Sequence, residues 1–138
     1  MRLKLNANRS LVAGKSVVMV DDSIVRGTTS GKIVQLLRDA GATAVHVCIS
    51  SPPVMDSCFY GIDTSERKEL IAASKTEEEI RQYIKADSLH YITMEGLRAS
   101  LSVLKPDDMC YACFNSHYPD GADKEMKKGS KLQFELGC

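Results

Sequence analysis

The chain has 138 residues, of which 43% are apolar and 26% charged, and its formal net charge is zero. This composition is typical of one globular domain, and the balanced charge gives no argument for a nucleic-acid or membrane-surface partner. No apolar run approaches the roughly 20 residues of a membrane span. We therefore expect a cytoplasmic protein, in which the five cysteines are thiols or metal ligands rather than disulfides.

The first half of the chain has the pattern of a strand–helix–strand unit. Residues 1–15 are basic and aperiodic, so we expect an extended lead-in, without a helix or strand of its own, that ends in a turn at Gly14. The apolar run in Ser16–Val20 predicts a buried strand of a parallel sheet. An amphipathic helix over about Ser30–Ala40 and a second apolar strand, Ala44–Ile49, follow. The two strands should be parallel, with a right-handed crossover.

The second half is expected to be mainly helical. Short helices are predicted over about Ser65–Ala73 and from Thr76, where Thr76 and Glu79 fit a capping box. The second of these helices should bury a stripe of Ile80, Tyr83 and Ile84. A short strand, Leu89–Ile92, and a further helix, Thr93–Leu104, come next. Beyond them the chain is rich in Pro, Gly, Asp and Lys and should be irregular.

The stretch after the first strand has the chemistry of a ligand site. Asp21 and Asp22 stand where that strand ends, and ligands of open α/β sheets bind outside this edge. Gly27 lets the backbone approach an anion, and the helix that begins there has free N–H groups. The neighbouring hydroxyl donors are Thr28, Thr29 and Ser30. The two acids would repel a phosphate, so they should face vicinal hydroxyls or Mg²⁺. The pattern predicts a site for a phosphorylated sugar.

Two other interpretations of this stretch stay open on composition alone. The hydroxyl residues could only cap the helix, with the two acids forming a solvated strand end. A receiver-type signalling domain also carries an acid pair after an apolar strand. It needs an acceptor Asp at the end of a later strand, however, and Asp56 and Asp63 follow the break at Pro52 and Pro53. The receiver interpretation therefore fits poorly.

Three of the cysteines form a possible metal site. Cys110 and Cys113 are a Cys-x-x-Cys pair, and Cys58 lies upstream. The pair is compatible with zinc, an iron–sulfur cluster or a redox dithiol. A redox dithiol usually opens a helix after a strand, which the residues before Cys110 do not suggest. Cys48 is expected in the core, and Cys138 is regarded as incidental.

The segment Asp21–Ser30 (Asp-Asp-Ser-Ile-Val-Arg-Gly-Thr-Thr-Ser) resembles the phosphoribosylpyrophosphate (PRPP) fingerprint of type I phosphoribosyltransferases, and most closely that of the glutamine PRPP amidotransferases. Other segments that are similar to this family are Arg2–Arg9, Ser51–Pro53, Cys58–Asp63, Glu69–Ala72, Ala86–Leu89 and Cys110–Phe114. The resemblance implies a partial type I phosphoribosyltransferase fold, a Rossmann-like parallel α/β sheet. Residues 1–104 would be the back part of that domain and residues 105–138 an irregular extension. The family's glutaminase domain would be absent, so the chain would be a fragment.

The family's function is also implied by this resemblance. It makes 5-phosphoribosylamine from PRPP and ammonia taken from glutamine, the first committed step of purine synthesis. Lys4 would be catalytic, at the end of a loop that closes over the pyrophosphate, and Asp21 and Asp22 would bind Mg²⁺. PRPP would be bound by Asp21, Asp22, Ser23, Arg26, Gly27, Thr28, Thr29 and Ser30. Purine nucleotides would be feedback inhibitors and the full-length enzyme a homo-oligomer, whereas the isolated chain is expected to be inactive.

One branch of this family carries a [4Fe–4S] cluster, and Cys58, Cys110 and Cys113 match three of its four ligands. The fourth ligand lies upstream of this chain in the family pattern. Two further hypotheses remain beside the enzyme: a non-catalytic phosphoribosyl- or nucleotide-binding regulatory module, and a small metal-binding structural domain.

Overall fold

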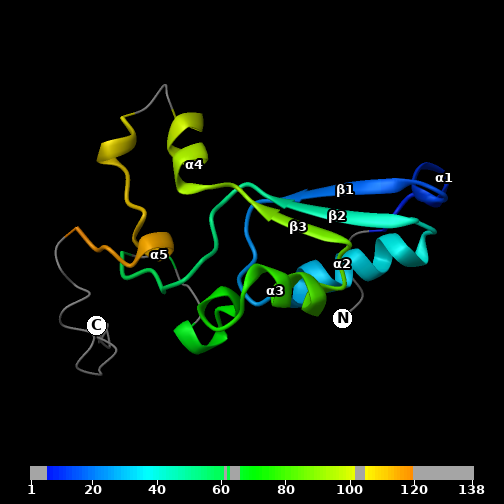
Figure 1. The fold of residues 1–138 in the computed structure, drawn as a ribbon, viewed down its shortest axis with the longest axis horizontal. Coiled ribbons are helices and arrows are strands. Elements are labelled where there is room, and N and C mark those ends of the chain that lie inside the picture. The colour runs from blue at the N-terminus through cyan, green and yellow to red at the C-terminus, as the bar shows by residue number, and fades with distance from the viewer. Residues whose placement is uncertain (1–5, 61, 63–65, 102–104, 120–138) are drawn as a thin grey trace, which may run out of the picture.

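Three parallel strands form the sheet of this computed structural model, which describes residues 6–60, 62, 66–101 and 105–119. The strands are β1 (Ser16–Asp21), β2 (Ala44–Ile49) and β3 (Ser88–Tyr91), and they pair in the order β1-β2-β3 (Figure 1). Their register aligns Val18 with His46 and His46 with Ser88. The predicted parallel α/β sheet is confirmed, and the carboxyl ends of the strands meet at one edge.

Two helices pack on the same side of this sheet (Figure 1): α2 (Thr28–Asp39) and α3 (Glu77–Ile84). Helix α2 ends in a Schellman motif, in which Gly41 adopts a φ of 97° and the N–H of Ala42 donates to the carbonyl of Leu37. Helix α3 begins with the predicted capping box. Both ends are thus set by local sequence, which fixes how far each helix extends along the sheet.

The core lies between the sheet and these two helices. The strands contribute Met19, Val45, Val47, Ile49 and Leu89, and the helices contribute Val34, Ile80 and Ile84, all of them buried. Full burial of one such side chain contributes roughly 1.5–3 kcal/mol. This apolar layer therefore holds β1 and α2, the two elements that flank the predicted ligand loop, in a fixed relation.

The other face of the sheet is only partly covered. Val18 and Val20 of β1 are 61% and 72% exposed, so the expectation of a fully buried strand is wrong for this face. Val18 and Val20 are exposed because α2 and α3 both pack on the opposite face of the sheet. His46 crosses the partly covered face in a polar row: its Nδ1 lies 2.8 Å from Ser88 Oγ and its Nε2 lies 3.1 Å from Ser16 Oγ.

Three expectations about local structure need correction. The lead-in contains a helical turn, α1 (Arg9–Val12), because Asn8 caps it by accepting from the N–H of Ser10. In place of a helix up to Ala73, the structure has two 3₁₀ turns, η1 (Arg67–Glu69) and η2 (Ile71–Ala73). They are separated because Leu70 is extended and the N–H of Ile71 donates to the carbonyl of Val25. Tyr83, expected in the buried stripe, is 50% exposed.

The last described part of the chain consists of short elements: α4 (Met94–Ser100), η3 (Pro106–Asp108) and α5 (Ala112–Asn115). Helix α4 is shorter than the predicted Thr93–Leu104, whose final residues lie outside the described ones. The carbonyl of Cys113 in α5 accepts from the N–H groups of Met55 and Asp56. The expected irregular extension therefore contains turns that pack on the loop after β2, and its boundary at 104/105 stays a prediction.

Within the described residues, none of the helices has the length and apolar character needed to cross a membrane.

Candidate functional site: a phosphate-type loop at the carboxyl end of strand β1

A cavity of about 430 Å³ opens where β1 ends and α2 begins. Its lining residues are Asp21, Asp22, Ser23, Val25, Arg26, Gly27, Thr28, Thr29 and Ser30. Every residue that the sequence resemblance assigned to PRPP binding is among them. The volume lies within the range of about 300–1,000 Å³ that is usual for small-molecule sites.

Gly27 shapes one wall of this cavity. It is the N-cap residue of α2 and adopts a left-handed conformation, with a φ of 74° and a ψ of −11°. A Cβ atom at this position would lie 3.0 Å from Ile71 Cδ1 and 3.1 Å from the Tyr83 ring. Glycine is therefore required here twice, for its backbone conformation and for the close approach of the neighbouring side chains.

The first turn of α2 has no side-chain cap. The N–H of Gly31 donates to the carbonyl of Gly27 at 2.9 Å, which closes the first turn. The N–H groups of the preceding residues, Thr28 to Ser30, belong to the first turn, which lacks intrahelical partners, and the positive end of the helix dipole lies there. A phosphate or another anion fits this end of the cavity.

The two acids line the same cavity from the β1 side. The Oδ1 atom of Asp21 accepts from the N–H of Asp22 at 3.0 Å, and the Oδ1 atom of Asp22 accepts from the Ser23 hydroxyl at 2.9 Å. The carbonyl of Asp21 also accepts from the N–H of Ser50 at 3.0 Å, which joins the ends of β1 and β2. The arrangement presents carboxylate and hydroxyl oxygens, the donors that Mg²⁺ prefers.

These acids do not make a complete metal site. Across the described part of the chain, no group of three or more His, Cys, Asp or Glu side chains is arranged to hold an ion. A magnesium ion would have to take its other ligands from water and from a bound phosphorylated molecule, which is how protein-bound Mg²⁺ is usually held.

Arg26, expected to bind phosphate, is paired with another side chain. Its Nη2 atom donates to Glu69 Oε2 at 2.8 Å, and both side chains are about half exposed. Glu69 belongs to one of the segments that resemble the amidotransferase family, but sequence reasoning gave it no role. No local pattern could have found it, because the two residues are 43 positions apart.

The three cysteines expected to bind a cluster lie at the loop after β2 and at α5. Burial raises the pKa of the half-buried Cys113 thiol, and the nearby Cys58 and Cys110 raise it further, so both of these thiols lie within electrostatic reach of Cys113. Cys110 is exposed and Cys58 is half-buried. The donor set is that of a thiolate metal site, although the described residues are not arranged as ligands.

Aromatic rings pack beside these thiols. The ring of Tyr118 lies 4.7 Å from that of Phe59 and 6.0 Å from that of Tyr60, measured between centroids. The Tyr118 hydroxyl donates to the carbonyl of Ser57 at 2.6 Å, and burial raises the pKa of Tyr118 to about 12. Cys48, by contrast, is half-buried in β2 rather than in the core. Lys4 and Cys138 lie outside the described residues.

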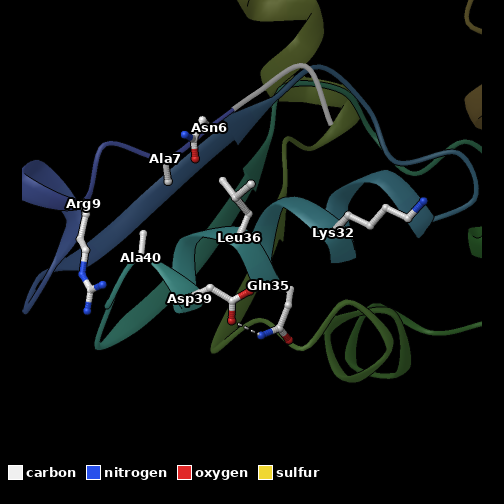
Figure 2. Close-up of a pocket in the computed structure, with 8 residues that line it drawn as sticks. All are labelled: Asn6, Ala7, Arg9, Lys32, Gln35, Leu36, Asp39 and Ala40. Atoms are coloured by element: carbon white, nitrogen blue, oxygen red, sulfur yellow. Dashed lines mark hydrogen bonds between the residues drawn. The ribbon is translucent and has the colours of Figure 1, made fainter. Parts of the chain in front are cut away.

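A second cavity, of about 550 Å³, lies between the lead-in and α2 (Figure 2). Its cationic side chains, Arg9 and Lys32, stand at opposite ends and do not converge on one point. The amide of Gln35 donates to Asp39 at 2.8 Å, so these two polar groups already satisfy each other. The cavity at the end of β1 is therefore the better candidate site.

A scan against models of protein families finds no match for this chain, but the chain is similar to several known proteins. The amidophosphoribosyltransferase of Bacillus subtilis is 58% identical over 123 residues, which are 86% of this chain and 26% of that protein. The Synechococcus elongatus enzyme of the same name is 50% identical, covering 98% and 27%. The chain is a relative of the amidophosphoribosyltransferases.

Solved structures lead to the same relationship. Glutamine PRPP amidotransferase from B. subtilis, complexed with ADP and GMP, matches with a TM-score of 0.79 and 56% identity over 86% of this chain and 27% of that one. A structure described as the allosteric regulatory enzyme of purine biosynthesis matches with a TM-score of 0.78 and 55% identity, over 86% and 26%. The chain thus spans about a quarter of the length of the amidophosphoribosyltransferases that it matches.

Proposed function

We propose that the cavity at the end of β1 binds the 5-phosphoribosyl group of PRPP, and that the chain provides this part of an enzyme that forms 5-phosphoribosylamine. The observation that carries the proposal is the juxtaposition of the Gly27-capped start of α2 with the Asp21–Asp22 pair in one cavity. One end of the cavity suits a phosphate and the other suits hydroxyls or a cation, so it is complementary to a sugar phosphate.

In this proposal the 5′-phosphate accepts hydrogen bonds from the N–H groups and hydroxyls of Thr28, Thr29 and Ser30. The carboxylates of Asp21 and Asp22 accept from the ribose hydroxyls and would hold Mg²⁺, which would supply charge neutralisation for the pyrophosphate. Ammonia released from glutamine then forms a bond to C1 of the ribose as the C1–O bond to pyrophosphate breaks. The residues of this chain act by positioning the sugar, since the step needs little acid–base chemistry from them. Lys4 remains the proposed contact to the pyrophosphate.

The proposal is tested by titrating the ¹⁵N-labelled chain with ribose 5-phosphate, with and without Mg²⁺. We expect the amide resonances of Thr28, Thr29 and Ser30 to shift, and the Asp21→Asn variant to lose the magnesium dependence. Ribose, which lacks the phosphate, is the matched control ligand. Resonances of this loop that do not respond to ribose 5-phosphate would refute the proposal.

Formation of phosphoribosylamine from glutamine also requires a source of ammonia. We propose that glutamine hydrolysis belongs to the part of the amidophosphoribosyltransferases outside the matched quarter. Purified chain should accordingly release no ammonia from glutamine. Glutaminase activity that co-purifies with the chain and is lost on substitution of one of its own cysteines would contradict this division.

A regulatory binding module is the second candidate function. It is favoured by one observation, that the B. subtilis neighbour is complexed with ADP and GMP. Purine nucleotides carry a 5′-phosphoribosyl group, so the same loop suits them. Competition between GMP and ribose 5-phosphate for the Thr28–Ser30 amides would show a shared site, and binding of GMP alone would favour the regulatory module.

We further propose that Cys58, Cys110 and Cys113 are ligands of a [4Fe–4S] cluster with a structural role. The support is that Cys58 and Cys110 lie within electrostatic reach of Cys113 and of the Tyr118 ring. Iron and sulfide analysis of the anaerobically purified full-length enzyme tests it, with Cys48→Ala as the control for Cys113→Ala. Protein that contains zinc or no metal would refute the cluster. We propose that the protein acts in the cytoplasm and that the full-length enzyme is a homo-oligomer. Several of the similar proteins, including two from Arabidopsis thaliana, are named chloroplastic.

A further inference from the structure

The phosphate-type loop, residues 25–30, contacts the segment of residues 69–71. Arg26 Nη2 lies 2.8 Å from Glu69 Oε2. The N–H of Ile71 donates to the carbonyl of Val25 at 2.9 Å. The side chain of Ile71 lies so close to Gly27 that a Cβ atom there would be 3.0 Å from Ile71 Cδ1. Three consecutive loop residues thus contact one short segment that is distant in sequence.

This segment is itself anchored in the core. Leu70, the extended residue between the two 3₁₀ turns, is fully buried, and Ile71, the first residue of η2, is 6% exposed. Glu69 is therefore joined directly to a buried residue, whereas Arg26 belongs to the loop that lines the candidate cavity. An ion pair between a residue next to the core and a loop residue restricts the loop.

We propose that Glu69 is a positioning residue, which holds Arg26 and thereby orients the N–H groups at the start of α2 toward the phosphate. In this arrangement the Arg26 guanidinium orients the loop and is not a phosphate ligand. The inference rests on the proposed function, because it assigns a role within the same site. It gives η1 a part in ligand binding although its residues do not line the cavity.

The alternative role for Arg26 predicts a different result. If its guanidinium bound the phosphate, the ion pair with Glu69 would compete with the ligand, so Glu69→Gln would bind ribose 5-phosphate as tightly as the wild type or more tightly. If the pair positions the loop, Glu69→Gln should weaken binding, and Arg26→Gln should weaken it at least as much. The double variant should then be no worse than Arg26→Gln alone, since both substitutions remove the same interaction.

The experiment measures the affinity for ribose 5-phosphate from the Gly27–Ser30 amide shifts of the 138-residue chain at 0.15 M salt, a concentration at which exposed charges more than about 8 Å apart are screened. We expect each single variant and the double variant to lose about two- to fivefold, the effect that an exposed ion pair supports, and the exchanged pair (Arg26→Glu with Glu69→Arg) to regain part of it. Glu78→Gln is the matched control, because it breaks an ion pair of 2.5 Å with Arg81 that does not contact the loop.

Amide hydrogen exchange of the ligand-free chain provides the second readout. Glu69→Gln should speed exchange at Gly27 and Ile71 while the thermal midpoint stays within the change shown by Glu78→Gln. Unchanged exchange at these amides, or undiminished affinity of Glu69→Gln, would overturn the positioning role. Absence of any loop response in the wild type would instead refute the proposed function, and the exchange data would still decide whether Glu69 orders the loop.

Discussion

Replacing Gly27 with alanine is the sharpest test of how the candidate site is built. The residue has a φ of 74°, which costs an L-residue about 1–2 kcal/mol. The added methyl group would also lie 3.0 Å from Ile71 Cδ1 and 3.1 Å from the Tyr83 ring. Tyr83 is half exposed and can shift, so we assign the contact about 1 kcal/mol, the lower end of overpacking costs. Gly27→Ala should therefore destabilise the chain by about 2–3 kcal/mol.

Gly14 provides the matched control for this variant. Its φ is 72°, almost the same as that of Gly27, but a Cβ atom there would have no neighbour within 4 Å. Gly14→Ala should therefore cost only the conformational term of about 1–2 kcal/mol. The difference between the two variants measures the contact between the loop and its neighbours, the side chains of Ile71 and Tyr83.

Urea denaturation followed by circular dichroism gives both free energies of unfolding, and the titration with ribose 5-phosphate gives the functional effect. Gly27→Ala should lose binding in addition to stability, whereas Gly14→Ala should bind normally once folded. Equal stability losses in the two variants would refute the steric argument. Normal ribose 5-phosphate binding by Gly27→Ala would refute the need for a close, left-handed approach of the backbone to the ligand.

Three further substitutions test the contacts that stabilise the helices and the sheet around the site. Gly31→Ala should stabilise the chain by about 0.5–1 kcal/mol in urea denaturation, because the position is helical and its Cβ atom would meet Ile84 Cα at an ordinary 3.6 Å; a loss would show that α2 and α3 are packed more tightly than described. Thr76→Ala should cost about 1 kcal/mol in the same assay by removing the α3 cap; no loss would show that the cap is dispensable. The pKa of Asp87 lies below its ordinary 3.8, mainly because its carboxylate accepts a hydrogen bond from the N–H of Val45. The ionised Asp87 therefore contributes its full stabilisation above pH 3.8, and this stabilisation is lost as the pH falls through the lower pKa of the folded state. Asp87→Asn should flatten this part of the acid-unfolding profile, and an unchanged profile would contradict the assignment.

Features set by neighbouring residues could be predicted from the sequence. The β1–α2–β2 unit follows from apolar periodicity and from Gly41, and β2 has the predicted bounds. The hydrogen bond from Gly31 to Gly27 and the cap at Thr76 join residues three or four positions apart, which a pattern records. The acids, the glycine and the hydroxyl residues of the candidate site accordingly line one cavity, as expected.

Features set by distant contacts could not be predicted in this way. The expected helix up to Ala73 is broken because Ile71 donates to Val25 across the fold. The apolar run of β1 suggested burial on both faces, but Val18 and Val20 are exposed because both packing helices lie on the other side. Neither the secondary-structure propensities of residues nor the periodicity of apolar residues indicates which face of a sheet a later helix covers.

The geometry of the site separates binding from catalysis. The acids and the phosphate-type loop come from the ten contiguous residues Asp21–Ser30, and the segment that restrains them ends at Ile71, so the described chain contains everything that the proposed sugar-phosphate contacts need. Bond breaking at C1 additionally needs a charge-neutralising group at the pyrophosphate and exclusion of water. The cavity supplies only two carboxylates toward that end, and those repel a pyrophosphate until a cation intervenes. Affinity for ribose 5-phosphate should therefore be measurable in this chain, whereas the proposed turnover should require groups that the cavity does not supply.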